Sequence, residues 1–169
     1  MKRQCGTCTL CCRLLPVKEL AKQANERCQH QRHTGCTIYK DRPMSCRAWS
    51  CAWLLGLANT KRPDHAHYVV DTMPDFVVTE DNDVQTKAPV IQVWCDPKHP
   101  LAYRDPDLLA LLEQRRMPAL IRFSGSGRAI FLVPGTLSST GMPFEKASQE
   151  SSAEHSMAEI FDVFTGRDT

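Results

Sequence analysis

The sequence predicts an α+β protein: a cysteine-rich module of helices and loops packed on a small mixed α/β unit, with a C-terminal helix. Eight of the nine cysteines lie before residue 52. The middle of the chain alternates short β-branched runs with one strongly apolar helical pattern. The end is polar and serine-rich until a single apolar stripe begins. We therefore divide the chain into residues 1–62, 63–134 and 135–169.

Two short helices are expected in the first segment. One covers residues 16–27 and leads from the first cysteines to Cys28. The other covers about residues 44–58 and ends at a polar stretch before Pro63. Trp49 and Trp53 are four residues apart, so they would share one face of this helix.

The middle segment has the composition of a small sheet with one helix. Asp105 is an N-cap candidate, and Pro106 occupies the first helical position before a leucine-rich face. The serine- and glycine-rich stretch 124–127 is typical of a hairpin turn. The expected strands are residues 68–70, 76–79, 90–94, 119–123 and 129–133.

The tail contains one helix signal. Ser151 and Glu154 fit a capping box at its start. The apolar stripe that follows ends at Gly166 and consists of Met157, Ile160, Phe161 and Phe164. We expect this helix to dock on the protein's own core.

The absence of long apolar runs bears on the compartment. No window reaches the roughly 20 apolar residues that span a bilayer, and the N-terminus has no apolar stretch typical of a secretory signal. These features predict a cytoplasmic, bacterial-type protein without a membrane partner. In that compartment thiols stay reduced, and dense cysteines usually bind metal.

The cysteine pattern predicts a metal-binding module in residues 1–62. Four thiols within eight residues form the pattern C-x2-C-x2-C-C, and C-x2-C steps turn two sulfurs toward one point. Thiolates bind zinc and iron strongly, and the same rhythm occurs in iron–sulfur loops. The candidate ligands are Cys5, Cys8, Cys11, Cys12, Cys28, Cys36, Cys46 and Cys51.

Eight thiols can serve two four-cysteine sites or one larger cluster. If residues 46–51 are helical, Cys46 and Cys51 lie about 140° apart around the axis and do not face one ion. The adjacent side chains of Cys11 and Cys12 also tend to diverge. Both points favour two nearby sites or one multinuclear centre over a single mononuclear site.

The charge distribution coincides with the cysteines. Residues 1–62 carry 12 Lys/Arg and 3 Asp/Glu, a formal +9, whereas residues 63–169 carry 9 and 16, a formal −7. Four thiolates around a zinc ion or a four-iron core leave about −2 per site, which basic neighbours can offset. The candidates are Arg13, Lys40, Arg42 and Arg47. A nucleic-acid surface is the alternative, but few aromatic residues accompany this charge.

Several motifs occur in a fixed order over about residues 5–55. They are Cys5-Gly6-Thr7-Cys8-Thr9-Leu10-Cys11-Cys12, Cys28 with His30, the stretches 35–39 and 41–47, and Trp49, Cys51 and Trp53. This combination resembles the CxxCxxCC cysteine-cluster family of zinc- or iron-chelating domains. The resemblance implies metal binding by about eight cysteines and, in many members, an iron–sulfur cluster. A related module occurs in flagellin lysine methylases. Some relatives have a further cysteine where this chain has Gln31.

The remaining candidates are weaker. His30 follows Cys28 at C-x-H spacing and could add a ligand, whereas Cys95 follows an apolar strand and is expected to be a buried free thiol. No catalytic triad or carboxylate pair stands out, so a non-enzymatic role is favoured. We expect an iron–sulfur protein that acts in electron transfer, in redox sensing or as an accessory to an enzyme, with a protein or redox partner. The alternative is a structural module with two zinc ions that binds a protein or nucleic acid.

Overall fold

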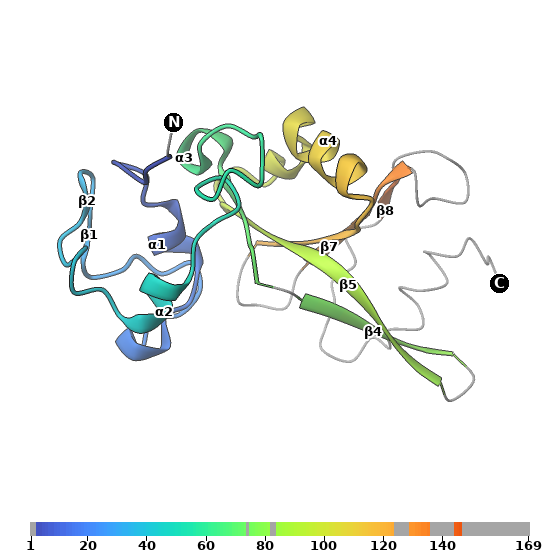
Figure 1. Cartoon of the computed structure of the whole chain (residues 1–169), viewed down its shortest axis with the longest axis horizontal. Helices are drawn as coiled ribbons and strands as arrows, with labels where there is room; N and C mark the ends of the chain where they lie inside the picture. Colours follow the sequence, from blue (N-terminus) through green and yellow to red (C-terminus); the bar gives the residue numbers. More distant parts are fainter. Residues whose placement is uncertain (1–2, 74, 82–83, 124–128, 136–143, 147–169) are drawn as a thin grey trace.

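The computed structural model describes residues 3–73, 75–81, 84–123, 129–135 and 144–146. Helices and strands both occur, so the predicted mixed α+β class is confirmed. The first part of the chain consists of short elements joined by loops (Figure 1). These elements are α1 (Leu10–Leu14), the 3-10 helix η1 (Lys18–Leu20), β1 (Gln31–Arg32), β2 (Gly35–Cys36), α2 (Met44–Ala48) and α3 (Pro63–Ala66).

The rest of the described chain contains a six-stranded sheet. Its strands are β3 (Tyr68–Val70), β4 (Asp75–Asp81), β5 (Val84–Cys95), β6 (Ala119–Arg122), β7 (Ala129–Val133) and β8 (Phe144–Lys146). The long strand β5 pairs antiparallel with β4 near its start and with β3 near its end, and parallel with β6. Strands β7 and β8 extend the sheet antiparallel. The predicted strands in this segment are confirmed, and β5 is longer than expected.

The parallel pair β5–β6 needs a crossover connection. It is made by the 3-10 helix η2 (Ala102–Arg104) and by α4 (Pro106–Arg115). The side chain of Asp105 accepts a hydrogen bond from the N–H of Asp107 at 2.9 Å, and Pro106 opens the helix. Arg116 ends it in the left-handed conformation, with φ 51°. The predicted cap and helix are therefore confirmed.

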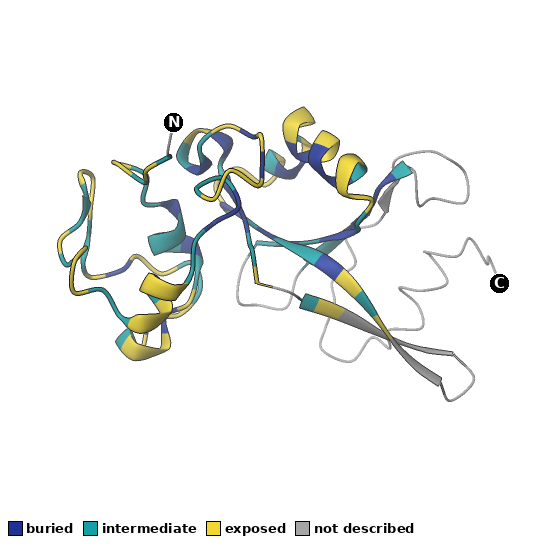
Figure 2. Ribbon diagram, in the orientation of Figure 1, coloured by how far each residue is buried: buried dark blue, intermediate teal, exposed yellow. Residues whose placement is uncertain are grey.

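Strands β3 and β5 separate two hydrophobic cores because their side chains alternate between the two faces of the sheet. On one face, Tyr68, Val93 and Cys95 belong to a core shared with α4. On the other, Val69 and Trp94 pack with Leu10 and Leu14 of α1. Buried positions concentrate along this part of the sheet and on the inner face of α4 (Figure 2). Helix α1 thus rests on the face opposite α4.

The predicted helix over residues 16–27 is wrong; only the three-residue turn η1 forms there. Val17 pairs with Lys22 in an isolated bridge, and Ala21 adopts a left-handed φ of 49°. The buried amino group of Lys22 donates to the carbonyls of residues 13, 15 and 23. These hydrogen bonds hold the chain in a compact loop instead of a helix.

The predicted helix over residues 44–58 is also wrong beyond its first turns, because α2 ends at Ala48. Trp49 is extended and its indole N–H donates to Asp71 at 2.7 Å. The N–H of Ala52 then donates to the carbonyl of Val70 at 3.0 Å. Pairing with the end of β3 therefore replaces the helical hydrogen bonds.

The structure does not test some of the other expectations. The predicted C-terminal helix and the turn at 124–127 lie outside the described residues. The boundaries at residues 62 and 134 stay predictions; the core beside α4 includes Ala52 and Ala58 from before the first of them. Among the described helices none has the length and apolar character that a bilayer crossing requires.

We predict that Leu108→Ala lowers the free energy of unfolding by about 2–5 kcal/mol, because it removes a fully buried side chain and leaves a cavity. The neighbouring Leu109, which is 37% exposed on the same helix, provides the matched control. Leu109→Ala should cost less than about 1 kcal/mol. Urea unfolding followed by circular dichroism measures both. Equal losses would contradict the described packing of α4.

We also predict that Lys22→Ala destabilises the protein by about 1–3 kcal/mol, because it removes a buried side chain that donates to three partly buried carbonyl oxygens. Lys18→Ala is the control, since Lys18 is exposed in the adjacent turn. It should change the free energy of unfolding by no more than about 0.5 kcal/mol. A similar small effect for Lys22→Ala in urea unfolding would show that its hydrogen bonds do not hold this loop.

Candidate metal centre

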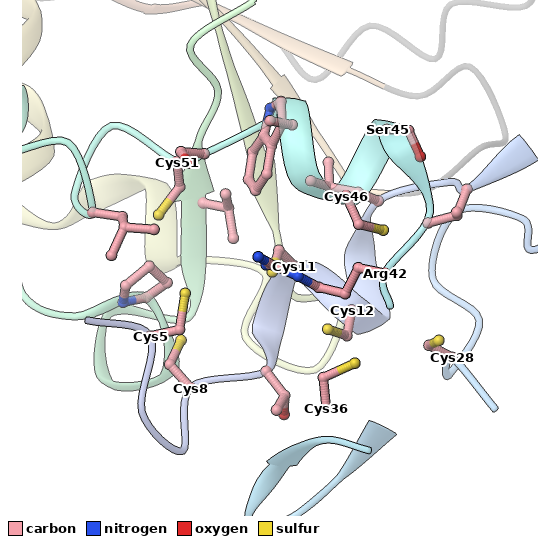
Figure 3. Close-up of a pocket in the computed structure, with 18 of the residues that line it drawn as sticks. Cys5, Cys8, Cys11, Cys12, Cys28, Cys36, Arg42, Ser45, Cys46 and Cys51 are labelled. Carbon is pink, nitrogen blue, oxygen red and sulfur yellow. The ribbon is translucent and has the colours of Figure 1, made fainter. Parts of the chain in front are cut away.

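All eight cysteines predicted as ligands line one cavity of about 460 Å³, although they come from separate parts of the chain. They lie in the N-terminal turn, α1, the loop before β1, β2, α2 and the stretch after α2. Figure 3 labels all eight around this cavity. The structure therefore brings together the complete predicted set. Cys95 is not among the lining residues and is buried on the opposite face of the sheet.

Main-chain hydrogen bonds place these thiols. The N–H of Cys8 donates to the carbonyl of Cys5 at 2.9 Å, in a tight turn where Gly6 has a φ of +54°. Such a positive φ favours glycine. The N–H of Cys28 donates to the carbonyl of Cys12 at 3.1 Å, which ties the loop to α1. The β1–β2 hairpin then carries Cys36 to the cavity.

The thiols lie in two groups in Figure 3. Cys5, Cys8 and Cys51 lie on one side, whereas Cys12, Cys28, Cys36 and Cys46 lie on the other. Cys11 lies between them in this view, and it packs in the same apolar cluster as Cys8 and Cys51. Because α2 ends at Ala48, no continuous helix links Cys46 to Cys51, and they reach different groups.

Burial makes four of these thiols hard to ionise. It raises the pKa of Cys8 to about 11 and also raises the pKa values of Cys5, Cys46 and Cys51. Binding of a cation would offset this cost, since metal ions take cysteine as the thiolate.

The adjacent Cys11 and Cys12 differ from each other. The thiol of Cys11 donates a hydrogen bond to the sulfur of Cys12, which raises the pKa of Cys11. The same hydrogen bond lowers the pKa of Cys12 to about 7, and the positive charges of Lys22 and Arg42 act in the same direction. The positive charges of Lys22 and Arg42 therefore favour the thiolate form of Cys12.

Two of the four basic residues predicted to lie near the thiols line the cavity. Arg42 and Arg47 line it, and the guanidinium of Arg42 lies 3.8 Å from the ring centroid of Tyr39. Arg13 instead pairs with Asp96, and Lys40 is exposed outside the lining. Lys22, whose charge acts on Cys12, was not among the predicted residues, because nothing in the sequence marks a lysine as buried.

An aromatic wall closes the cavity against the sheet. The indole N–H groups of Trp49 and Trp94 donate to the two oxygens of Asp71 at 2.7 and 3.2 Å. These two tryptophans and Trp53 pack with Leu10 and Leu14. The role of Asp71 could not be predicted from its neighbours in the sequence, since its two partners lie 22 and 23 residues away in the chain. The wall shields the thiols from water on this side.

The donor set fits a metal centre in its chemistry. Thiolates suit zinc, copper(I) and iron–sulfur clusters. Around one zinc ion, four sulfurs at about 2.3 Å from the metal lie about 3.8 Å apart. Among the described residues, one group of three has its ligand atoms within 4.8 Å of one another, and it consists of His67, Asp96 and His99. No three of the described cysteine sulfurs come that close together, so the thiols are more widely spread than the ligands of one zinc ion. His30 lines the cavity and its role as a ligand stays a prediction.

The family resemblance depends on the cysteine motifs of about residues 5–55. Those motifs contain every cysteine that lines the cavity, and they end before the sheet of β3 to β8 begins. Neither a family model nor a curated protein nor a solved structure matches the chain.

Proposed function

We propose that this is a metal-binding protein that carries iron–sulfur cluster chemistry in the cysteine-lined cavity. The observation that supports it best is that eight thiols from separate segments line one cavity of about 460 Å³. A polynuclear cluster needs such space between its ligands, whereas a single tetrahedral ion draws its sulfurs together. The resemblance to the CxxCxxCC cysteine-cluster family supports the same proposal.

We further propose two ligand sets of four thiols each. One set consists of Cys5, Cys8, Cys11 and Cys51, and the other consists of Cys12, Cys28, Cys36 and Cys46. The two groups in Figure 3 and the packing of Cys8, Cys11 and Cys51 in one apolar cluster support this division. Adjacent Cys11 and Cys12 would then each serve a different set.

The proposed role is electron transfer, redox sensing or assistance to an enzyme, in a reducing compartment such as the cytoplasm. The apolar wall of tryptophans lowers solvent access on one side, and Arg42 and Lys22 offset negative charge near Cys12. Burial and charge of this kind tune the reduction potential of a cluster. A protein or redox partner would supply or accept the electrons.

The alternative is a structural module with two zinc ions that binds a protein or nucleic acid. The same division into four and four thiols favours it, since sites with four cysteine ligands are typical of structural zinc. A nucleic-acid role has less support. Three arginines outside the cavity are paired with aspartates, in the pairs Arg13–Asp96, Arg62–Asp64 and Arg122–Asp75.

We predict that protein purified without oxygen is brown and contains iron and acid-labile sulfide in equal amounts, at about four of each per cluster. A visible spectrum and metal and sulfide analysis of the same sample measure this. A colourless protein with about two zinc ions per chain would overturn the iron–sulfur proposal and support the alternative.

We predict that Cys8→Ser and Cys46→Ser each remove about half of the bound metal, because each variant empties one set of ligands. Cys95→Ala is the control and should keep the full metal content, since Cys95 lies on the other face of the sheet. Metal analysis of the soluble fraction measures all three. Loss of all metal in either serine variant would indicate one shared centre. Full metal content in both would contradict the ligand assignment.

A further inference from the structure

A second group of metal-ligating side chains lies outside the cysteine cavity. His67, Asp96 and His99 each offer a ligand atom, and these atoms all lie within 4.8 Å of one another. None of the three lines the cavity. The group lies where α3 ends and where the chain leaves β5.

Backbone pairing assembles this group. Tyr68 pairs with Cys95 in the antiparallel β3–β5 ladder, so His67 and Asp96 are the next residues beyond it. The N–H of Asp96 donates to the carbonyl of His67 at 2.9 Å. The N–H of His99 donates to the carbonyl of Asp96 at 2.8 Å, which closes a turn through Pro97. The three residues are therefore held together by their main chains.

The side chains offer both a fixed ligand and an open side. Asp96 is only 3% exposed, whereas His67 is half-buried and His99 is exposed. The two imidazole rings stack with centroids 3.5 Å apart and an interplanar angle of 5°. Because an ion lies in the plane of a ring that binds it, the rings must turn out of this stack. His99 has room to turn, since it is exposed.

The carboxylate of Asp96 is oriented before any ion binds. Arg13 pairs with Oδ2, and the N–H of Lys98 donates to Oδ1 at 3.1 Å. Each carboxylate oxygen has a further lone pair, so Oδ1 can still ligate a cation. The positive charge of Arg13 repels a cation bound to Asp96. We therefore expect this group to bind a metal ion more weakly than a structural zinc site does.

The geometry points to a second metal site at His67, Asp96 and His99, which takes a divalent transition ion that prefers imidazole and carboxylate ligands, such as Zn²⁺ or Fe²⁺. Two histidines and one carboxylate leave coordination positions open toward solvent. This site would have nitrogen and oxygen ligands, in contrast to the eight thiols of the cavity. Arg13 connects the two, because it directly follows Cys12 and binds Asp96.

The test is equilibrium dialysis of the full-length protein, purified without oxygen, against Zn²⁺ at a fixed concentration. Four proteins are compared: the unchanged protein, His67→Gln, His99→Ala and the control His65→Ala. His65 is a suitable control because its side chain is 70% exposed and it lies two residues from His67. Zinc, iron and acid-labile sulfide are counted in each sample, and circular dichroism confirms that each variant is folded.

We expect His67→Gln and His99→Ala to hold one zinc equivalent less than the unchanged protein and His65→Ala. Iron and sulfide should be equal in all four. Because the result is a difference between variants, it does not depend on which metal the thiols hold, and failure of the iron–sulfur proposal would leave it intact. Equal zinc in all four proteins would overturn the second site. Equal loss in His65→Ala would also overturn it, by showing unspecific binding to surface histidines.

Discussion

The packing of α1 against β3 and β5 is the contact on which the candidate centre depends. Leu10 and Leu14 bury themselves against Val69 and Trp94, on the face of the sheet that α4 leaves uncovered. This contact places Cys11 and Cys12, which lie between the two leucines in the chain, at the cavity that Val69 and Trp94 also line. The loops that carry the other thiols are then tied to α1, as in the hydrogen bond from Cys28 to Cys12. One apolar contact therefore positions a polar, thiol-rich structure.

The sequence predicted the parts of the fold that are determined locally. Strand composition, the Asp105 cap and Pro106 identified elements that the structure contains. The two failed helices share one cause, which is competition from partners outside the helical hydrogen-bond pattern. Lys22 binds carbonyl oxygens of its own loop, and Trp49 binds Asp71 across 22 residues. The spacing of apolar residues within 16–27 and 44–58 contains no information about such partners.

The same distinction applies to the two candidate sites. The thiols could be selected from their spacing alone, because eight cysteines in 47 positions are a local signal. His67, Asp96 and His99 could not be, since the register of β3 and β5 brings them together. In the sequence, His67 lies 29 and 32 residues from Asp96 and His99, so nothing near it indicates a set of metal ligands. Strand register, which depends on the whole sheet, thus decides whether a site exists.

The first segment has too little apolar core to fold by burial alone. Its described helices have three to five residues, and the cluster it shares with the sheet has four buried members. Domains with so small a core usually require disulfides or metals. The thiols are free, and burial raises the pKa of several of them. A bound metal would replace their protons and cross-link the separate loops at once, which would stabilise the fold of residues 3–62.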